Sequence, residues 1–477
     1  MSSLDRRTFL SLLGAGALAA AWPRRAQAAQ TRPNIVFMLA DDLGRHQTAC
    51  YGNPFYETPN VDRLASEGMR FMNAYAAAPV CSPTRASIMT GKYPARLHLT
   101  DFIPGSPFPN AKLKTPDWTK HLPVEETTIA EMLRDAGYAC GHFGKWHLSV
   151  DKLYRPGRPG DPDTQGFEDV LALDKPESSE AAAAGADPDY DAHHTREITD
   201  RGIAFMRKNH DKPFFCYMAY SAVHRPEMEY APRILKYAVK PEACNEVGNN
   251  PVLAAMMETL DTNVGRVLDT LDELGIADNT IVVFFSDNGD LYGRFGRKPL
   301  YGAKADLYEG GIRMPLIVRW PGVVRASSVS DAMVHSNDFF PTFAEIAGAP
   351  DPGAAVDGIS FTPALKGAAS LDRDTLYWHF PHYHSIGLGP SGAIRQGRYK
   401  LIEWFEHSVT APDAPGALEL YDLETDLGET RNLAAEMPEL ARELHGKLVA
   451  WRRAVNAQEM ALNPDYIPAR ASGKGRD

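Results

Sequence analysis

Two short apolar segments limit what this chain can fold into more than any other feature of its sequence. One segment covers Asn34–Ala40 and the other covers Ile281–Phe285. A continuous apolar run of this length is typical of a strand that is buried on both faces of a parallel sheet. Because parallel strands need long connections, usually helices, the sequence predicts an α/β fold.

Each of these segments runs directly into oxygen-bearing side chains, which are Asp41, Asp42, Asp287 and Asn288. Open α/β sheets place their ligands at the carboxyl ends of the strands, so we expect the four side chains to converge. Carboxylate and amide oxygens suit calcium or magnesium rather than zinc. We predict one calcium ion per chain at this edge, with magnesium or manganese as alternatives. Taken singly, each pair would be a helix cap or a solvated turn.

The rest of the pattern predicts a large, mostly parallel central sheet flanked by helices, followed by a smaller C-terminal α+β subdomain. A further strand is expected at Phe214–Tyr220, and helices near 58–67, 126–136, 199–209, 251–274 and 438–455. Residues 151–195, rich in Pro, Asp, Gly and Ala, are interpreted as a surface insertion. We place the main α/β domain at 32–370, the subdomain at 371–468 and a disordered tail at 469–477.

The composition and charge of the chain limit the classes of molecule that it can bind. The chain has 477 residues, of which 44% are hydrophobic, so it can bury one large core or two unequal ones. Its formal net charge is −11, which argues against a nucleic-acid partner. An anionic substrate would have to be held by local cations rather than by the field of the whole protein.

The N-terminal residues 1–28 are predicted to be a twin-arginine export signal. Arg6 and Arg7 precede a short apolar run that ends at the small-residue site Ala26-Gln27-Ala28. The alternative, a membrane anchor, is disfavoured because the run from Phe9 to Trp22 is too short to span a bilayer. We therefore expect the twin-arginine translocon as a partner, a periplasmic or secreted location, and no stable membrane anchor.

The segment Cys81–Gly91 reads CSPTRASIMTG and is predicted to form a helix with a reactive side chain at its start. Pro83 suits the first helical turn and Gly91 suits the stop. Cys81 would lie at the positive end of the helix, where free N–H groups hold an oxyanion and make a thiol more acidic. The alternative is a small buried thiol with Arg85 on the surface one turn later.

Other candidate residues lie at expected strand ends or in loops. Lys145 and His147 are two residues apart in the sequence GKWH, where the glycine lets the backbone approach a ligand. His224 follows the strand Phe214–Tyr220, and Lys304 precedes another apolar strand. Loop residues that could reach a substrate are His98, Asp101, His382 and His384. In isolation, each of these is equally compatible with an ordinary solvated or core polar group.

The five cysteines are Cys50, Cys81, Cys140, Cys216 and Cys244. None shows the paired spacing of a zinc site. If Cys81 is modified, the other four could form disulfides in an oxidising compartment, or they could be buried free thiols.

The Cys-x-Pro-Thr-Arg sequence of Cys81–Arg85, together with Gly144–Leu148, Gly302–Pro315 and Glu419–Ala434, resembles the formylglycine-dependent sulfatases. The resemblance covers Arg32–Ala434 with the motifs in order. It implies an alkaline-phosphatase-like fold. It also implies that a formylglycine-generating enzyme converts Cys81 to formylglycine (3-oxoalanine), whose hydrate would share the calcium ion with Asp41, Asp42, Asp287 and Asn288.

The same resemblance implies roles for the other side chains. Arg85 and Lys145 would stabilise charge near the nucleophilic hydroxyl. Lys304 and His224 would hold the sulfate oxygens and assist the leaving alcohol. His147 would take a proton from the second hydroxyl, so that sulfate is released and the aldehyde returns.

A sulfuric ester hydrolase acting on sulfated carbohydrates, with aryl sulfates as artificial substrates, is the predicted function. The loop Leu97–Gly105 is similar to that of exo-acting sulfatases for galactose-type sugars. One alternative is a phosphonate monoesterase or phosphodiesterase of the same superfamily. Another is a catalytically silent protein that binds sulfated glycans.

The chain departs from the family pattern at two places. It has Arg45-His46-Gln47-Thr48 where many relatives have an aromatic, a small residue and an acid. It has Asp290 where many have proline. Neither change removes an expected ligand, but both are expected to alter the substrate pocket.

Overall fold

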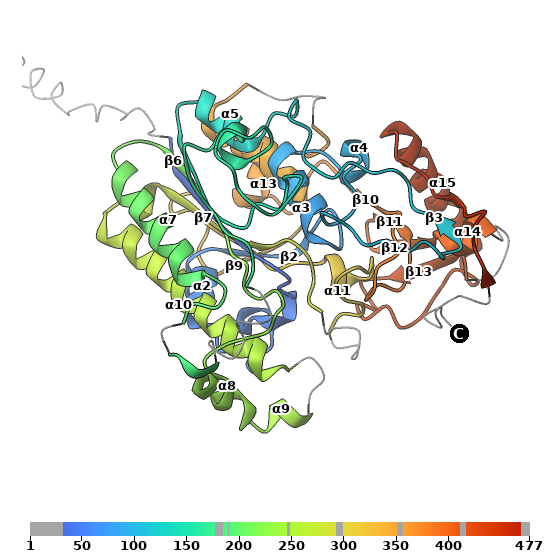
Figure 1. The fold of residues 1–477 in the computed structure, drawn as a ribbon, viewed down its shortest axis with the longest axis horizontal. Helices are drawn as coiled ribbons and strands as arrows, with labels where there is room; N and C mark the ends of the chain where they lie inside the picture. Colours follow the sequence, from blue (N-terminus) through green and yellow to red (C-terminus); the bar gives the residue numbers. More distant parts are fainter. Residues whose placement is uncertain are drawn as a thin grey trace, which may run out of the picture. The chain divides into compact units, whose positions relative to one another are not determined.

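An eight-stranded sheet with the order β5-β4-β6-β1-β7-β8-β2-β9 forms the centre of the computed structural model (Figure 1). Its strands are β1 (Asn34–Ala40), β2 (Met69–Tyr75), β4 (Ala139–Gly144), β5 (Asp169–Ala172), β6 (Phe214–Ala219), β7 (Thr280–Ser286), β8 (Leu316–Arg319) and β9 (Ser328–His335). Every neighbouring pair is parallel except the two that involve β8. The prediction of a large, mostly parallel sheet is therefore confirmed.

The structure describes residues 32–176, 185–188, 190–245, 249–291, 299–350, 356–410 and 416–468. The predicted export signal, residues 1–28, and the predicted tail, residues 469–477, lie outside the described residues. The chain from Pro33 onward forms one compact unit. In the part that the structure describes, no helix combines the length and the apolar character needed to cross a membrane.

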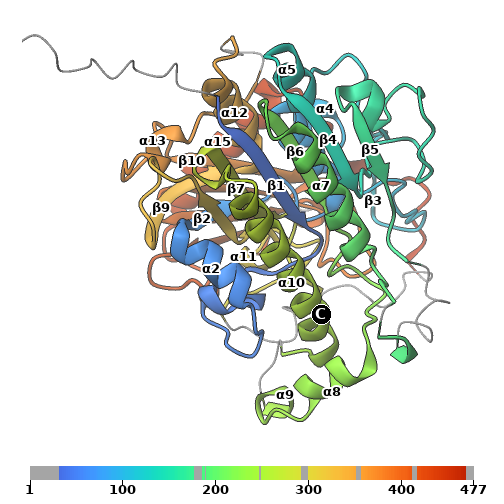
Figure 2. The ribbon, with the colours of Figure 1, turned by 90° about the vertical axis from the view of Figure 1, so that its left-hand side faces the viewer.

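Helices cover both faces of the sheet, as its buried strands require. Figure 2 shows α7 (Thr195–Asn209) and α10 (Pro251–Glu273) running across one face. Along β1, alternate side chains enter different cores: Phe37 packs in the core that includes α3 (Cys81–Thr90), whereas Met38 packs with α7 and α10. The remaining covering helices are α2 (Pro59–Glu67), α5 (Ile129–Asp135) and α12 (Phe339–Ala347).

A second, antiparallel sheet forms the C-terminal subdomain, beside the central sheet in Figure 1. Its strands are β10 (Thr375–Phe380), β11 (Ser391–Gln396), β12 (Tyr399–Trp404) and β13 (Leu418–Asp422), and α15 (Pro438–Ala454) packs its apolar stripe on them. The prediction of a smaller α+β subdomain is confirmed. Shorter elements are α4 (Pro94–Leu97), α8 (Ala231–Ala238), α9 (Glu242–Asn245), α11 (Glu309–Ile312), α13 (Thr362–Leu365), α14 (Phe405–Thr410), β3 (Leu113–Lys114) and β14 (Ala461–Leu462).

The interpretation of residues 151–195 as a surface insertion is wrong in one respect. This segment contains β5, which pairs with β4 and forms one edge of the central sheet. Because β5 is an edge strand whose four residues are all half-buried, it lacks the continuous apolar run that reveals a central strand. The helix expected from residue 199 also begins earlier, at Thr195.

A buried ion network joins the two sheets. Lys400 on β12 is completely buried, and its Nζ donates to Glu309 Oε1 and Glu429 Oε1, each at 2.9 Å. Tyr75, at the end of β2, donates its hydroxyl to Glu309 Oε2 at 2.7 Å. Burial alone would raise the pKa of Glu309, but Lys400 and Arg313 hold it at about 2. The subdomain is thus anchored to the segment that begins α11.

We expect Lys400→Met to lower the free energy of unfolding by about 3–5 kcal/mol, because it leaves buried carboxylates without their cation. Denaturant unfolding of both proteins measures this difference. Lys366→Met is the matched control: the Lys366 side chain is 60% exposed, and its replacement should change stability by less than about 0.5 kcal/mol. Equal stability of Lys400→Met and the wild type would show that the network does not anchor the subdomain.

Candidate active site

The oxygen-bearing side chains predicted from the strand ends lie together. Asp41 and Asp42 follow β1, Asp287 and Asn288 follow the neighbouring β7, and all four are buried. The backbone N–H of Asp42 donates to Asp287 Oδ1 at 3.2 Å, and Asn288 Nδ2 donates to Asp42 Oδ1 at 2.7 Å. The parallel register of the two strands therefore gathers three carboxylates and an amide at one point.

Cys81 faces this cluster from the first residue of α3. The helix ends at Gly91, whose φ of 71° is the left-handed value expected at a helix stop. The Cys81 Sγ lies 3.4 Å from Asp41 Oδ1 and 3.9 Å from Asp42 Oδ1. Ligand atoms of Asp41, Asp42, Cys81 and His224 all lie within 4.8 Å of one another, a spacing that could hold a metal ion.

Two lysines neutralise the two carboxylates that follow β1. Lys145 Nζ donates to Asp41 Oδ2 at 2.5 Å. Lys304 Nζ donates to Asp42 Oδ1 at 2.6 Å and lies 3.3 Å from Cys81 Sγ. Both side chains are buried, so these contacts are only weakly screened by solvent. Asp41 stays ionised because Lys145, His224 and Arg85 lower its pKa more than burial raises it.

Arg85 is buried beneath the cluster and is not on the surface. Its Nε donates to Asp287 Oδ2 at 2.9 Å, and its Nη1 donates to the Lys145 carbonyl at 2.9 Å. Arg85 lies one turn after Cys81 on α3, so a single helix supplies both groups. The guanidinium thereby fixes the orientation of one carboxylate and the position of the GKWH segment.

The two histidines differ in what their ring nitrogens contact. His147 Nε2 lies 2.7 Å from the Ile103 carbonyl. A carbonyl can only accept, so Nε2 carries the proton and Nδ1 keeps a lone pair. Burial and the charge of Lys145 lower the pKa of His147, which keeps its ring neutral. His224 Nε2 lies 3.5 Å from Asp42 Oδ2, and burial lowers the pKa of His224 to about 4.

These groups open into a cavity of about 330 Å³. The residues at its base are Asp42, Cys81, Lys145, His147, His224 and Lys304. The wall of the cavity includes the apolar residues Phe102, Ile103 and Ile386. Pockets of this volume and mixed lining are typical of small-ligand sites.

Of the four predicted substrate-binding residues, the structure brings only His384 to the cavity. The ring of His98 instead contacts the Asn456 carbonyl at 2.8 Å. Asp101 and His382 are buried against each other, with 3.7 Å between Asp101 Oδ2 and His382 Nδ1, and do not line the cavity. Burial raises the pKa of Asp101 to about 7.

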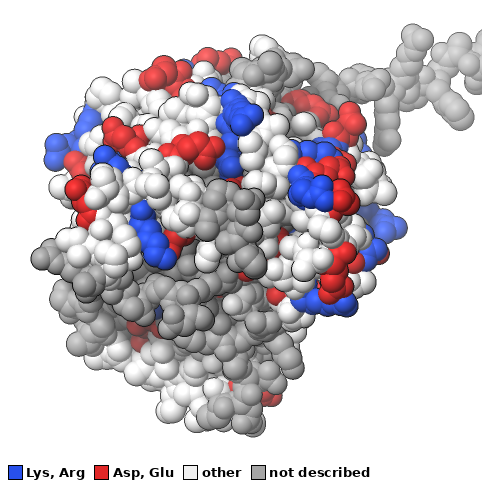
Figure 3. Space-filling view, turned by 90° about the vertical axis from the view of Figure 1, so that its right-hand side faces the viewer, with Lys and Arg blue, Asp and Glu red and all other residues white. Residues whose placement is uncertain are grey.

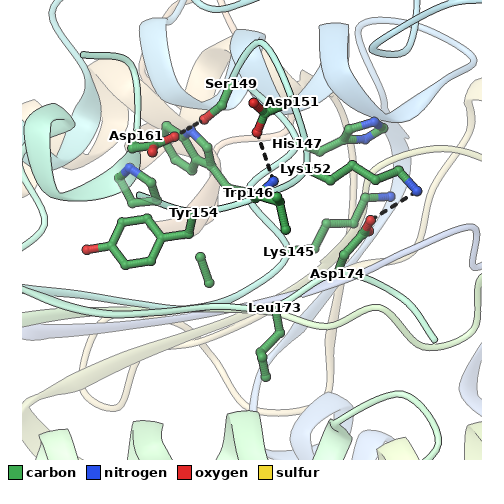
Figure 4. A pocket seen from close by; sticks show the side chains of 13 residues that line it. Lys145, Trp146, His147, Ser149, Asp151, Lys152, Tyr154, Asp161, Leu173 and Asp174 are labelled. Atoms are coloured by element: carbon green, nitrogen blue, oxygen red, sulfur yellow. Dashed lines mark hydrogen bonds and ion pairs between the residues drawn. The ribbon is translucent and has the colours of Figure 1, made fainter. Parts of the chain in front are cut away.

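Four charged residues that line the cavity were not predicted from the sequence: Lys152, Asp174, Lys175 and Arg225. Figure 4 shows the ion pair between Lys152 and Asp174. Arg225 could have been found, because it directly follows His224 after a predicted strand. Lys175 lies three residues after the end of β5, so finding it from the sequence requires recognising β5.

The local environment of Cys81 contradicts the expected acidity of its thiol. Burial and then the charge of Asp41 raise the pKa of Cys81, and the positive start of α3 does not offset them. Cys50, Cys140 and Cys216 are also free, and the side chain of Cys244 lies outside the described residues.

The two departures from the family pattern lie in contact with each other. His46 Nε2 is 3.1 Å from Asp290 Oδ2, and both side chains are buried. Asp290 also accepts the backbone N–H of Lys304 through its carbonyl at 2.7 Å. The unusual residues therefore form one pair beside the loop that carries Lys304.

Comparison with known proteins identifies the class of the chain. Residues 33–349 match the family model Sulfatase, and residues 300–454 match the model N-sulphoglucosamine sulphohydrolase, C-terminal. The chain belongs to the sulfatase family, which confirms the predicted resemblance and the prediction of a sulfuric ester hydrolase. The fold with its large mixed sheet and C-terminal antiparallel sheet is that of its structural neighbours.

Individual relatives extend over nearly the whole chain. A sulfatase from Formosa agariphila is 32% identical, covering 92% of each chain. Human arylsulfatase A is 32% identical over 92% of this chain and 89% of its own. The crystal structure of Ps i-CgsB in complex with k-i-k-neocarrahexaose superposes with a TM-score of 0.71 at 25% identity, covering 92% of this chain and 95% of that chain.

We expect the unmodified Cys81 thiol to react with iodoacetamide at least about 100-fold more slowly in the folded protein than in guanidinium, because it is buried and its pKa is raised. Peptide mass spectrometry of timed samples measures the labelling rate. Cys50, which is only partly buried, is the internal comparison. Rapid labelling of Cys81 in the folded protein would contradict the described environment.

Proposed function

We propose that this chain hydrolyses sulfate esters of carbohydrates, with aryl sulfates as artificial substrates, and that Cys81 converted to formylglycine supplies the nucleophile. The position of Cys81 carries the proposal. Its Sγ lies 3.4 Å from Asp41 Oδ1 and 3.3 Å from Lys304 Nζ, at the base of the cavity. A nucleophile there would meet an ester that enters from the cavity.

The donor set fits a calcium ion held by Asp41, Asp42, Asp287 and Asn288. All the donors are oxygens, the ligand type that calcium prefers. Asn288 Oδ1 is buried and has no hydrogen-bond partner in the part of the chain described. An unpaired buried carbonyl oxygen beside three carboxylates is accounted for by a cation that it would ligate.

The proposed chemistry is divided between the calcium ion, the formylglycine at position 81 and the protein's own side chains. A bound calcium ion would supply Lewis-acid polarisation, and the hydrate of the formylglycine aldehyde would supply the attacking hydroxyl. Lys304 and His224 would hold the sulfate oxygens, and Lys145 would stabilise charge near the attacking hydroxyl. Arg85 orients Asp287, and His224 Nε2 lies where it can assist the leaving alcohol. His147 Nδ1, which keeps its lone pair, would accept the proton of the second hydroxyl of the hydrate, and the loss of that proton would release sulfate.

A carbohydrate is the proposed natural substrate because the cavity combines polar and apolar walls. Phe102 and Ile386 suit the C–H face of a sugar ring, whereas His384 can bind its hydroxyls. Local cations, rather than the surface as a whole, would attract the anion: on the face shown in Figure 3, the coloured acidic and basic residues are intermixed. The oligosaccharide bound to Ps i-CgsB also supports a glycan substrate.

The burial of Cys81 supports an order of events for its maturation. A modifying enzyme cannot reach a side chain that is 1% exposed, so formylglycine formation would precede folding. Twin-arginine export carries folded proteins, so modification would take place in the cytoplasm and the mature enzyme would be periplasmic or secreted. Residues 1–28 would then be removed, leaving the catalytic α/β domain at 32–370 and the subdomain at 371–468.

Protein made with a formylglycine-generating enzyme should carry an aldehyde at position 81 and release sulfate from 4-nitrophenyl sulfate and from sulfated sugars. Mass spectrometry of the Cys81 peptide and sulfate assays measure both. Cys81→Ala should lose at least about 1000-fold in kcat/KM, whereas Cys50→Ala, outside the cavity, should retain activity. Full turnover by a protein with an intact thiol would overturn the formylglycine proposal.

The same assays separate the alternative functions. A faster rate on an aryl phosphodiester than on an aryl sulfate would assign the chain to phosphodiester or phosphonate hydrolysis. Binding of a sulfated glycan without sulfate release, with the aldehyde present, would assign it to the silent binding proteins. Release of sulfate in preference to phosphate supports the sulfatase proposal.

Calcium at about 100 times its Kd should raise the free energy of unfolding of the metal-depleted protein by about 2.7 kcal/mol. Thermal unfolding and the calcium content measured by mass spectrometry provide readouts that are independent of activity. Asn288→Ala should weaken this stabilisation, and Asp278→Asn, an exposed change, should leave it intact. If magnesium raised the free energy of unfolding more than calcium did, magnesium would be assigned to the site instead.

A further inference from the structure

Lys152, Asp174 and Lys175 form a cationic cluster on the wall of the cavity, away from the groups that act on the ester. All three line the cavity that contains Cys81. Asp174 Oδ2 is paired with Lys152 Nζ at 3.1 Å, and Asp174 Oδ1 accepts the backbone N–H of Lys175 at 2.9 Å. Asp174 therefore pairs with the ammonium group of Lys152 but contacts only the backbone of Lys175, and the two lysines and one aspartate carry a net positive charge.

Lys175 is the uncompensated member of this cluster. In the described ranges, no carboxylate oxygen lies within ion-pair distance of its ammonium group, and the side chain is half-buried. Burial, and then the positive charges of Lys145 and Lys152, lower the pKa of Lys175, so its ammonium group lies in a region of positive potential. A half-buried cation without a carboxylate partner is stabilised when an anion binds beside it.

The topology of the sheet fixes how far this cluster lies from the reacting ester. Lys145 follows β4 and Lys175 follows the adjacent edge strand β5, whereas Asp41 and Asp42 follow β1. Strands β5 and β1 are three positions apart in the sheet, or about 14 Å. Because lysine side chains are long, the cluster can reach a group on the sugar that carries the ester or on the next sugar.

We propose that Lys175, positioned with Lys152 by Asp174, forms a second anion subsite that selects saccharides carrying another anionic group besides the sulfate that is cleaved. This inference rests on the proposed sulfatase function and adds a substrate class to it. The second group is a sulfate or a carboxylate, because either one matches an ammonium pair. A neutral or singly charged sugar leaves the subsite without a partner.

Binding to the Cys81→Ala protein tests the subsite without requiring turnover. Calorimetry would compare three ligands: a monosulfated sugar, the same sugar with a second sulfate, and the same monosulfated sugar linked to a uronic acid. We expect at least one doubly anionic ligand to bind about tenfold or more tightly than the monosulfated sugar, as one charge-assisted contact allows. Which of the two binds more tightly identifies the second group.

Variants at Lys175 then locate the preference. Lys175→Gln should abolish the tenfold difference, Lys175→Arg should restore most of it, and Lys366→Gln, distant from the cavity, should keep it. Loss of affinity for all three ligands alike in Lys175→Gln, or retention of the preference, would overturn the subsite. In the protein with its aldehyde, Lys175→Gln should leave kcat/KM on 4-nitrophenyl sulfate within about twofold. Failure of the wild-type protein with its aldehyde to release any sulfate would refute only the proposed function, because the binding comparison does not depend on turnover.

Discussion

The structure depends on the burial of several carboxylates at adjacent strand ends. Asp41, Asp42 and Asp287 lie at the carboxyl edge of β1 and β7 with at most 2% of their surface exposed. Removing a carboxylate from water costs several kcal/mol unless a cation and hydrogen bonds compensate it. Lys145 and Lys304 provide that compensation for the first two. Burial and the charge of Asp41 raise the pKa of Asp287 to about 7, so the cluster accepts further positive charge at its centre.

The cations reach this cluster from segments far apart in the chain, and the fold must hold each segment in place. Lys145 is held through its own carbonyl by Arg85 of α3. Lys304 is held at its backbone by Asp290, five residues before the buried network of Glu309 and Lys400. The C-terminal subdomain therefore contributes to the site indirectly, because its Lys400 fixes the segment that follows Lys304.

The sequence was sufficient for the parts of the site that lie at buried strand ends. Asp41 and Asp287 each follow a strand whose apolar run is easy to recognise, and the sheet brings them together because parallel strands share one carboxyl edge. The start of α3 was predictable from Pro83 and Gly91. The pKa of the Cys81 thiol was not predictable from the sequence. Burial and a neighbouring carboxylate raise it more than the helix terminus lowers it, and both of these depend on tertiary packing.

The cavity wall was much less predictable, for a related reason. The loop after α4 buries Asp101 against His382, which follows β10, while Phe102 and Ile103 of the same loop line the cavity. Composition alone does not distinguish a loop polar group that faces inward from one that faces a ligand. The edge strand β5 was missed because a half-buried strand of four residues has no distinctive periodicity.

This contrast between base and wall has a physical consequence for specificity. The base consists mainly of buried charges, where removing one partner leaves another uncompensated at a cost of several kcal/mol. The wall is made of half-exposed side chains on an edge strand and its loops, where a substitution changes stability little. A residue of the base can therefore be substituted only together with its charged partners, whereas a wall residue such as Lys175 can be substituted alone. Differences in substrate between chains with this base are accordingly expected to arise from residues on the β5 side of the cavity.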